Sequence, residues 1–213
     1  MGCCCPHSKS GGRLFSFFAR SYRRRFAKKG FEPSQVQLMA GLEQAGYQDA
    51  SLLEVGSGVG YLHQVLLKQG AKNAVGIDLA VDMLKEAESW ANEKGLSERT
   101  KYIQGDFIEL LEQVEAADIT ILDKVVCCYP HAELLVKSSI AKTKRVYALT
   151  YPRNRWFIRI VIEMMAFFFK LSGSDFRAFV HRPESIEKWI TQAGFKKVYQ
   201  EQTFIWLSQI YTK

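Results

Sequence analysis

A glycine-rich loop is the first group in this sequence whose spacing suggests chemistry. The apolar run Ser51–Val55 is followed by Gly56, Gly58 and Gly60, after which a helical pattern begins. A strand that turns sharply into a helix needs glycine, because glycine adopts positive φ cheaply and lets a ligand approach the backbone. A dinucleotide fingerprint would need its third glycine at Tyr61, and no Gly-Lys-Ser/Thr triplet follows for a P-loop. The loop therefore predicts a ligand site of another kind.

Acidic residues stand at the ends of two expected strands beside this loop. Glu54 precedes the first glycine, and Asp78 ends the next apolar run, 24 residues later. An acid at about this distance from a glycine loop accepts both ribose hydroxyls in α/β nucleotide sites. A third acid, Asp106, lies between Gly105 and Phe107. The spacing predicts a site for an adenosine-containing ligand.

The run from Glu54 to Gly60, Asp78 and the triplet Gly105–Phe107 resemble the first three motifs of class I S-adenosylmethionine (SAM) dependent methyltransferases. The resemblance extends from about Phe31 to the C-terminus. It implies SAM as cofactor and an α/β fold: a Rossmann-like, seven-stranded, mostly parallel sheet with an antiparallel C-terminal hairpin and helices on both faces. A Rossmann-like protein with another adenosine ligand is the alternative.

The resemblance also implies which residues bind the cofactor. Asp106 would accept from the adenine amino group, Phe107 would lie beside the ring, and Asp123 would hold the methionyl amine. The full implied set is Glu54, Gly56, Ser57, Gly58, Gly60, Asp78, Leu79, Asp106, Phe107 and Asp123.

Charge distinguishes a basic segment, residues 1–30, and the resemblance implies that residues 31–213 form the methyltransferase domain. Residues 1–31 hold eight of the 29 basic residues and none of the 22 acidic ones. Within 13–29, four aromatic residues recur at helical spacing: Phe15, Phe18, Tyr22 and Phe26. This amphipathic helix is interpreted as a lid over the cofactor; contact with an anionic membrane surface and a targeting role are the alternatives.

The cysteines favour a reducing, cytoplasmic setting. They occur as Cys3–Cys5 and as the pair Cys127 and Cys128, which is a poor disulfide framework. Residues 1–12 are expected to be mobile, no standard metal-ligand spacing occurs, and no apolar run is long enough to span a membrane. A soft-metal or metalloid site formed by both cysteine groups is retained as an alternative.

The rest of the chain alternates between helical and strand patterns. Strands are expected at 51–55, 73–78, 101–104, 118–123, 145–150, 196–202 and 205–211, and helices at 33–45, 61–69, 81–94, 131–141, 156–171 and from 183 to about 193. Ser34 and Gln37 have capping-box spacing. The helix at 156–171 is almost wholly apolar, with Arg159 and Glu163 spaced to pair; it is interpreted as a core or lid helix, with a substrate-facing or membrane-dipping role as the alternative.

Methyl transfer from SAM needs an in-line nucleophile, so positioning and exclusion of water can supply much of the acceleration. A base helps if the acceptor is a hydroxyl or an acidic carbon. The candidates beyond the fourth strand are Tyr129, His131 and Asp123, with His181 further along.

The acceptor is expected to be a small, lipophilic or acidic molecule. The motifs of DNA amino- and cytosine-C5-methyltransferases are absent, so sequence-specific nucleic-acid binding is not expected. Residues 118–130 and 183–195 distantly resemble the methyltransferases of quinone precursors and of magnesium protoporphyrin. Arg153, Arg155 and Arg182 are candidate partners for a substrate carboxylate. A non-catalytic SAM-binding module and a membrane-surface protein remain alternatives.

Overall fold

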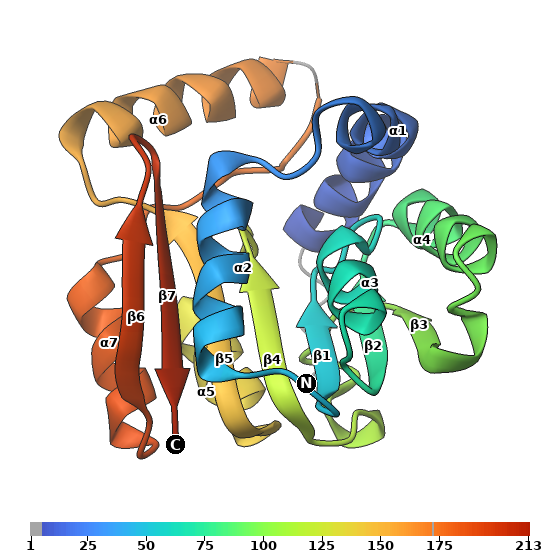
Figure 1. Cartoon of the computed structure of the whole chain (residues 1–213). Coiled ribbons are helices and arrows are strands. Elements are labelled where there is room, and N and C mark those ends of the chain that lie inside the picture. The colour runs from blue at the N-terminus through green and yellow to red at the C-terminus, as the bar shows by residue number, and fades with distance from the viewer. Residues whose placement is uncertain (1–5, 172) are drawn as a thin grey trace.

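The computed structural model describes residues 6–171 and 173–213 and contains one seven-stranded sheet (Figure 1). The strand order is β3-β2-β1-β4-β5-β7-β6; β7 runs antiparallel to both β5 and β6, and the other neighbouring strands pair in parallel. The strands are β1 (Ser51–Val55), β2 (Asn73–Asp78), β3 (Thr100–Gln104), β4 (Ala117–Asp123), β5 (Thr143–Pro152), β6 (Lys196–Gln202) and β7 (Trp206–Thr212). The predicted Rossmann-like sheet and its antiparallel C-terminal hairpin are confirmed.

Helices cover both faces of the sheet and the edge where the parallel strands end (Figure 1). One face carries α2 (Pro33–Ala45), α3 (Tyr61–Lys68) and α4 (Val81–Glu93), and the other carries α5 (Ala132–Ala141) and α7 (Pro183–Gln192). The helices α1 (Pro6–Lys29) and α6 (Trp156–Leu171) lie beyond the carboxyl ends of the strands. Ligands bind at this edge in open α/β sheets, so α1 and α6 lie where they can cover a site.

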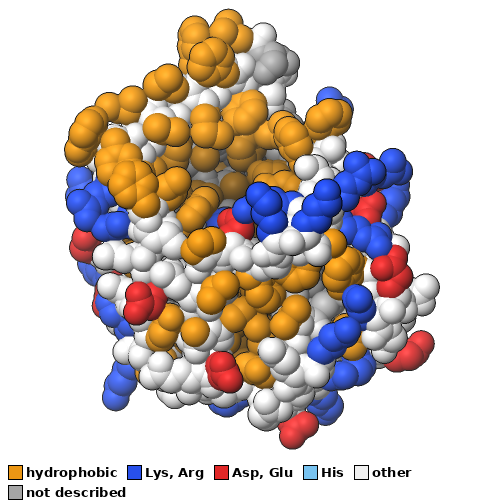
Figure 2. All heavy atoms as spheres, turned by 45° about the horizontal axis from the view of Figure 1, so that its top comes forward, with side chains coloured by type: hydrophobic (Ala, Val, Ile, Leu, Met, Phe, Trp, Pro, Cys, Tyr) orange, Lys and Arg blue, Asp and Glu red, His pale blue; other side chains and the backbone are white. Residues whose placement is uncertain are grey.

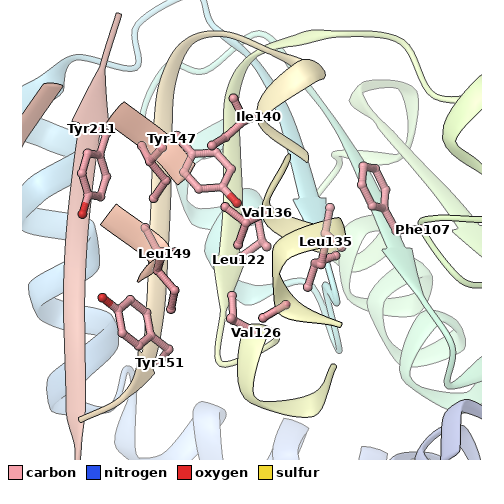
Figure 3. Packing of buried hydrophobic residues seen from close by; sticks show 14 of the residues in the cluster. Phe107, Leu122, Val126, Leu135, Val136, Ile140, Tyr147, Leu149, Tyr151 and Tyr211 are labelled. Carbon is pink, nitrogen blue, oxygen red and sulfur yellow. The ribbon is translucent and has the colours of Figure 1, made fainter. Parts of the chain in front are cut away.

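Alternating side chains along the central strands divide the core between the two faces. Leu52 and Ile121 pack with α2 and α3, whereas their chain neighbours Leu53 and Leu122 pack with α5 and α7. Figure 3 shows the cluster on the α5 and α7 face, where Tyr147, Leu149 and Tyr151 project from β5. A strand buried on both faces is apolar throughout, which explains why these runs show little alternation in sequence.

Three local predictions were wrong. Residues 6–12 were expected to be mobile, but α1 begins at Pro6. The capping box of α2 uses Glu32 and Gln35, whose side chain accepts a hydrogen bond from the Glu32 backbone N–H at 3.1 Å, and not Ser34 and Gln37.

The expected pairing of Arg159 with Glu163 is the third error. Arg159 donates to the side chain of Asn154, and Glu163 pairs with Arg177 from the segment after α6. A tertiary partner thus replaces the helical neighbour four residues away.

Within 6–171 and 173–213 no helix is long and apolar enough to cross a membrane.

Candidate cofactor site and active site

The loop between β1 and α3 has a backbone that only glycine adopts easily. Gly56, Gly58 and Gly60 have φ angles of 67°, 53° and 74°. A Cβ on Gly56 would also lie 2.4 Å from Val125, so that glycine is required by packing as well. The loop is thereby held close under the end of β4.

Asp78 at the end of β2 fixes the middle of this loop. Its carboxylate accepts hydrogen bonds from the backbone N–H of Gly58 at 2.7 Å and of Ala80 at 2.8 Å. Burial raises the pKa of Asp78, and the backbone hydrogen bonds oppose this shift. A carboxylate has about four acceptor positions, so Asp78 keeps capacity for a ligand hydroxyl.

Glu54 has a structural partner that the sequence did not reveal. Its carboxylate lies 2.5 Å from Nδ1 of His63, and the other ring nitrogen of His63 lies 2.9 Å from the hydroxyl of Tyr102. Glu54 and His63 are both fully buried, and burial raises the pKa of Glu54 while His63 opposes the shift. Glu54 borders the cavity described below, but its carboxylate is bound to His63 of α3.

Asp106 and Tyr129 meet across the predicted adenine side of the site. The hydroxyl of Tyr129 donates to Asp106 Oδ1 at 2.6 Å, and the backbone N–H of Ile108 donates to the same oxygen at 3.0 Å. Phe107 is buried in the core on this side. The sequence named Tyr129 and Asp106 separately and did not predict that they bind each other.

Asp123 at the end of β4 is held by Gln35 of α2, and its neighbour Lys124 is held by Glu32, the cap of α2. One carboxylate oxygen accepts from the side chain of Gln35 at 2.8 Å, and the other is buried without a hydrogen-bond partner within the described chain. Lys124 adopts a φ of 61°, which turns the chain sharply, and its ammonium lies 2.7 Å from Glu32. Glu32, Gln35 and Lys124 were not identified from the sequence, because no motif marks them.

These groups surround one cavity of about 240 Å³. The predicted residues that line it are Glu54, Gly56, Ser57, Gly58, Asp78, Leu79, Asp106, Phe107, Asp123 and Tyr129. Gly60 and His131 do not line it. Gly60 is instead the residue before α3, and His131 is exposed before α5.

The helix α1 forms one wall of the cavity through Phe15, Tyr22 and Phe26. Phe26 stacks on Tyr61 with ring centroids 4.0 Å apart, and Arg23 pairs with Glu86 of α4 at 2.9 Å. Phe15, Tyr22 and Phe26 occupy the inner face, as the aromatic spacing predicted, but Phe18 is not among the lining residues. This placement favours the lid interpretation.

One further part of the wall comes from the chain beyond β5. Phe176 lies in the connection between α6 and α7, lines the cavity and packs edge-on against Phe15, with ring centroids 5.4 Å apart. It also packs edge-on against Phe169 of α6, at 5.8 Å. The aromatic wall therefore continues from α1 to α6.

Of the four base candidates, the structure places Tyr129 and Asp123 at the cavity. His181 lies outside the lining, with Nε2 3.2 Å from the carbonyl oxygen of Tyr129, and burial lowers its pKa. The three arginines proposed for a substrate carboxylate, Arg153, Arg155 and Arg182, do not line the cavity either.

The structure describes only two of the five cysteines in the hypothetical metal or metalloid site. Cys3–Cys5 lie outside the described residues. Cys128 lines the cavity, and Cys127 is buried beside it with the two sulfur atoms 3.9 Å apart. The neighbouring thiol of Cys128, and then burial, raise the pKa of Cys127, which disfavours its thiolate.

The cavity lining fits a SAM-like ligand. Ser57 Oγ, the Tyr61 hydroxyl and Asp123 Oδ1 are buried polar atoms without a partner in the described chain, and all three residues border the cavity. Buried polar groups are normally hydrogen-bonded, so these atoms indicate a polar ligand. A Cβ on Gly58 would meet no protein atom within 4 Å, which leaves space over the loop.

Comparison with known proteins identifies the family of the chain. A family model described as a methyltransferase domain matches residues 48–202. The chain belongs to this methyltransferase family. It is a SAM-dependent methyltransferase, since the family uses this cofactor, and the predicted cofactor is thereby confirmed. No curated protein matches the sequence.

Solved structures of low identity share the fold. Magnesium protoporphyrin IX methyltransferase from Synechocystis PCC 6803 with bound SAM has a TM-score of 0.73 and 16% identity, covering 100% of both chains. The same enzyme with bound SAH has a TM-score of 0.70 and 17% identity, covering 94% of this chain and 98% of that one. The cyclase SpnF has a TM-score of 0.73 and 13% identity, covering 98% and 97%. These likenesses concern the fold; the acceptor must be argued from the site.

A substitution at Gly58, compared with one at Gly95, tests whether the cofactor lies over the glycine loop, because both changes strain the backbone in the same way. Gly58→Ala is expected to weaken SAM binding about tenfold or more, because the added methyl enters space over the loop. Gly95→Ala is the matched control, since Gly95 also has positive φ and open space for a Cβ but does not line the cavity. Calorimetric titration with SAM measures both; equal affinities would contradict the placement of the cofactor over Gly58.

A substitution at Phe26 tests the lid. Phe26→Ala removes the stacking on Tyr61, so tryptic cleavage within the arginine-rich α1 is expected to be about tenfold faster than in the wild type. Phe17→Ala changes a side chain that is 82% exposed and should leave the rate unchanged. Added SAM should slow cleavage of the wild type. If both variants were cut at the wild-type rate, Phe26 would not hold α1 in place.

Proposed function

We propose that this methyltransferase transfers the methyl group of SAM to a small lipophilic molecule that binds beneath α1. The observation that supports this acceptor class is the aromatic wall of Phe15, Tyr22, Phe26 and Phe176 around one side of the cavity. Aromatic rings bury a large apolar area and favour flat, apolar ligands. Such a wall, opposite the polar loop, suits an acceptor that is apolar apart from its reacting atom.

The polar side of the cavity is proposed to position the cofactor. Asp78 would accept from the ribose hydroxyls, Asp106 from the adenine amino group, and Asp123 Oδ1 from the methionyl ammonium. SAM supplies a methyl group that is already activated on sulfur. The chain then has to orient the acceptor, exclude water and, for a hydroxyl acceptor, provide a proton acceptor at the cavity. Asp123 and Tyr129 line the cavity, but Asp123 is assigned here to the ammonium and Tyr129 donates its proton to Asp106, so the proposed mechanism relies on orientation and exclusion of water.

An acidic acceptor has less support than a lipophilic one. Among the described residues that line the cavity, the cations are Arg25 and Lys124, and both pair with Glu32. A substrate carboxylate would have to displace Glu32 from them. Nucleic acid also remains an unexpected partner, and the cytoplasmic location stays a prediction.

The test begins with cofactor binding. Calorimetric titration with SAM and with its demethylated product should give micromolar affinity. Asp123→Asn should weaken SAM binding by about 1.5–3 kcal/mol, because a charge-assisted hydrogen bond is lost. Asp82→Asn, at a half-exposed site on α4 outside the cavity lining, is the control.

The acceptor class is then tested by methyl transfer. Apolar aromatic alcohols are expected to accept the methyl group, and carboxylated analogues of the same size to accept it more slowly. Rapid turnover of the carboxylated analogues alone would overturn the lipophilic assignment. Tight SAM binding with no turnover of either set would favour a non-catalytic SAM-binding module.

A further inference from the structure

The outward side of α6 presents apolar side chains to solvent over the whole helix. Ile158 is its one buried residue among the described side chains. The six most exposed apolar residues of α6 and the adjoining β6–β7 turn are Trp156, Met164, Phe167, Phe168, Leu171 and Phe204, with exposed fractions between 55% and 75%. These define the α6 face, which Figure 2 shows as a continuous group of hydrophobic side chains. An exposed patch of this kind marks a contact surface.

Helical geometry explains why the patch is so broad. Arg159, Glu163 and Lys170 fall on one narrow strip, at positions i, i+4 and i+11. The remaining outward positions are apolar over 16 residues, or about 24 Å of helix. Packing against the core does not account for these apolar side chains, because α6 contacts the rest of the protein through its other side, which carries the buried Ile158.

The surroundings of the α6 face are basic. Arg155, Arg159 and Lys170 stand on or beside α6 and are exposed, and Glu163 there is paired with Arg177. The C-terminal end of α1 lies on the same side of the molecule (Figure 1) and ends in the exposed residues Lys28 and Lys29. Figure 2 shows lysine and arginine side chains on both flanks of the hydrophobic group.

We propose that the α6 face docks on an anionic lipid bilayer. Helices that lie in a membrane interface combine bulky apolar side chains, which enter the acyl boundary, with cations that meet the headgroups. A second copy of the chain is a poorer occupant, because a two-fold interface would bring the basic flanks of both copies together. A lipid surface of negative charge satisfies both the apolar and the basic groups.

The proposal gives a route for a lipophilic acceptor but does not depend on it. Phe169 of α6 contacts Phe176, which lines the cavity, so the docked helix would adjoin the aromatic wall. Vesicle binding is measured without SAM or acceptor. A failure of docking would therefore leave the proposed function untouched, and the reverse also holds.

Sedimentation with vesicles tests the docking. The full chain is mixed with vesicles of phosphatidylglycerol and phosphatidylcholine, and with vesicles of phosphatidylcholine alone. Binding is expected to favour the anionic vesicles and to weaken as salt is raised, because screening reduces the attraction of the basic flanks. The double variant F167S/F168S should bind the anionic vesicles at least about tenfold more weakly.

The matched control is L134S/V198S, which changes exposed apolar residues of α5 and β6. It should bind as the wild type does, and circular dichroism should show all three proteins folded. Equal binding by F167S/F168S and the wild type would overturn the proposal, as would no binding by the wild type. A wild-type dimer in sedimentation velocity that F167S/F168S dissociates would assign the α6 face to a second copy instead.

Discussion

The hydrogen bond from the Gly58 backbone to Asp78 joins the two features on which the site depends. It ties a loop of three left-handed glycines to the end of the neighbouring strand. The strand order reverses direction between β1 and β4, so this loop opens into the crevice where an α/β sheet binds its ligand. Because Val125 closes over Gly56 from the β4 side, the loop has little freedom to move away. The cofactor side of the cavity, formed by the glycine loop and Asp78, is therefore rigid and polar, whereas the side that faces the acceptor can vary.

The sequence predicted the glycine loop and Asp78 well because the determinants of this part of the site are local. Positive φ favours glycine, and Asp78 follows the glycine loop at the distance expected for an acid at the end of the next strand, so Gly58 and Asp78 were found from spacing. The strands and helices were found for the same reason, since apolar periodicity marks them directly.

Contacts between distant segments could not be predicted in this way. The pairing of Glu54 with His63, of Asp106 with Tyr129 and of Asp123 with Gln35 each depends on how separate elements meet. The positive φ of Lys124 is not marked by a glycine, so nothing in the sequence showed the turn that brings its ammonium to Glu32. His131 was named for its position after β4, but its position before α5 leaves it exposed.

The lid and membrane interpretations of the basic N-terminal segment are compatible in this fold. The inner side of α1 closes the cavity through Phe15 and Phe26, and Arg23 fastens the helix to α4. Its other cations, such as Arg24 and Lys28, face solvent. Since one side of the helix suffices to cover the cavity, the opposite side is available for anionic headgroups. Docking at the α6 face would then hold the lid and the aromatic wall beside a lipid surface, where a lipophilic acceptor is most concentrated.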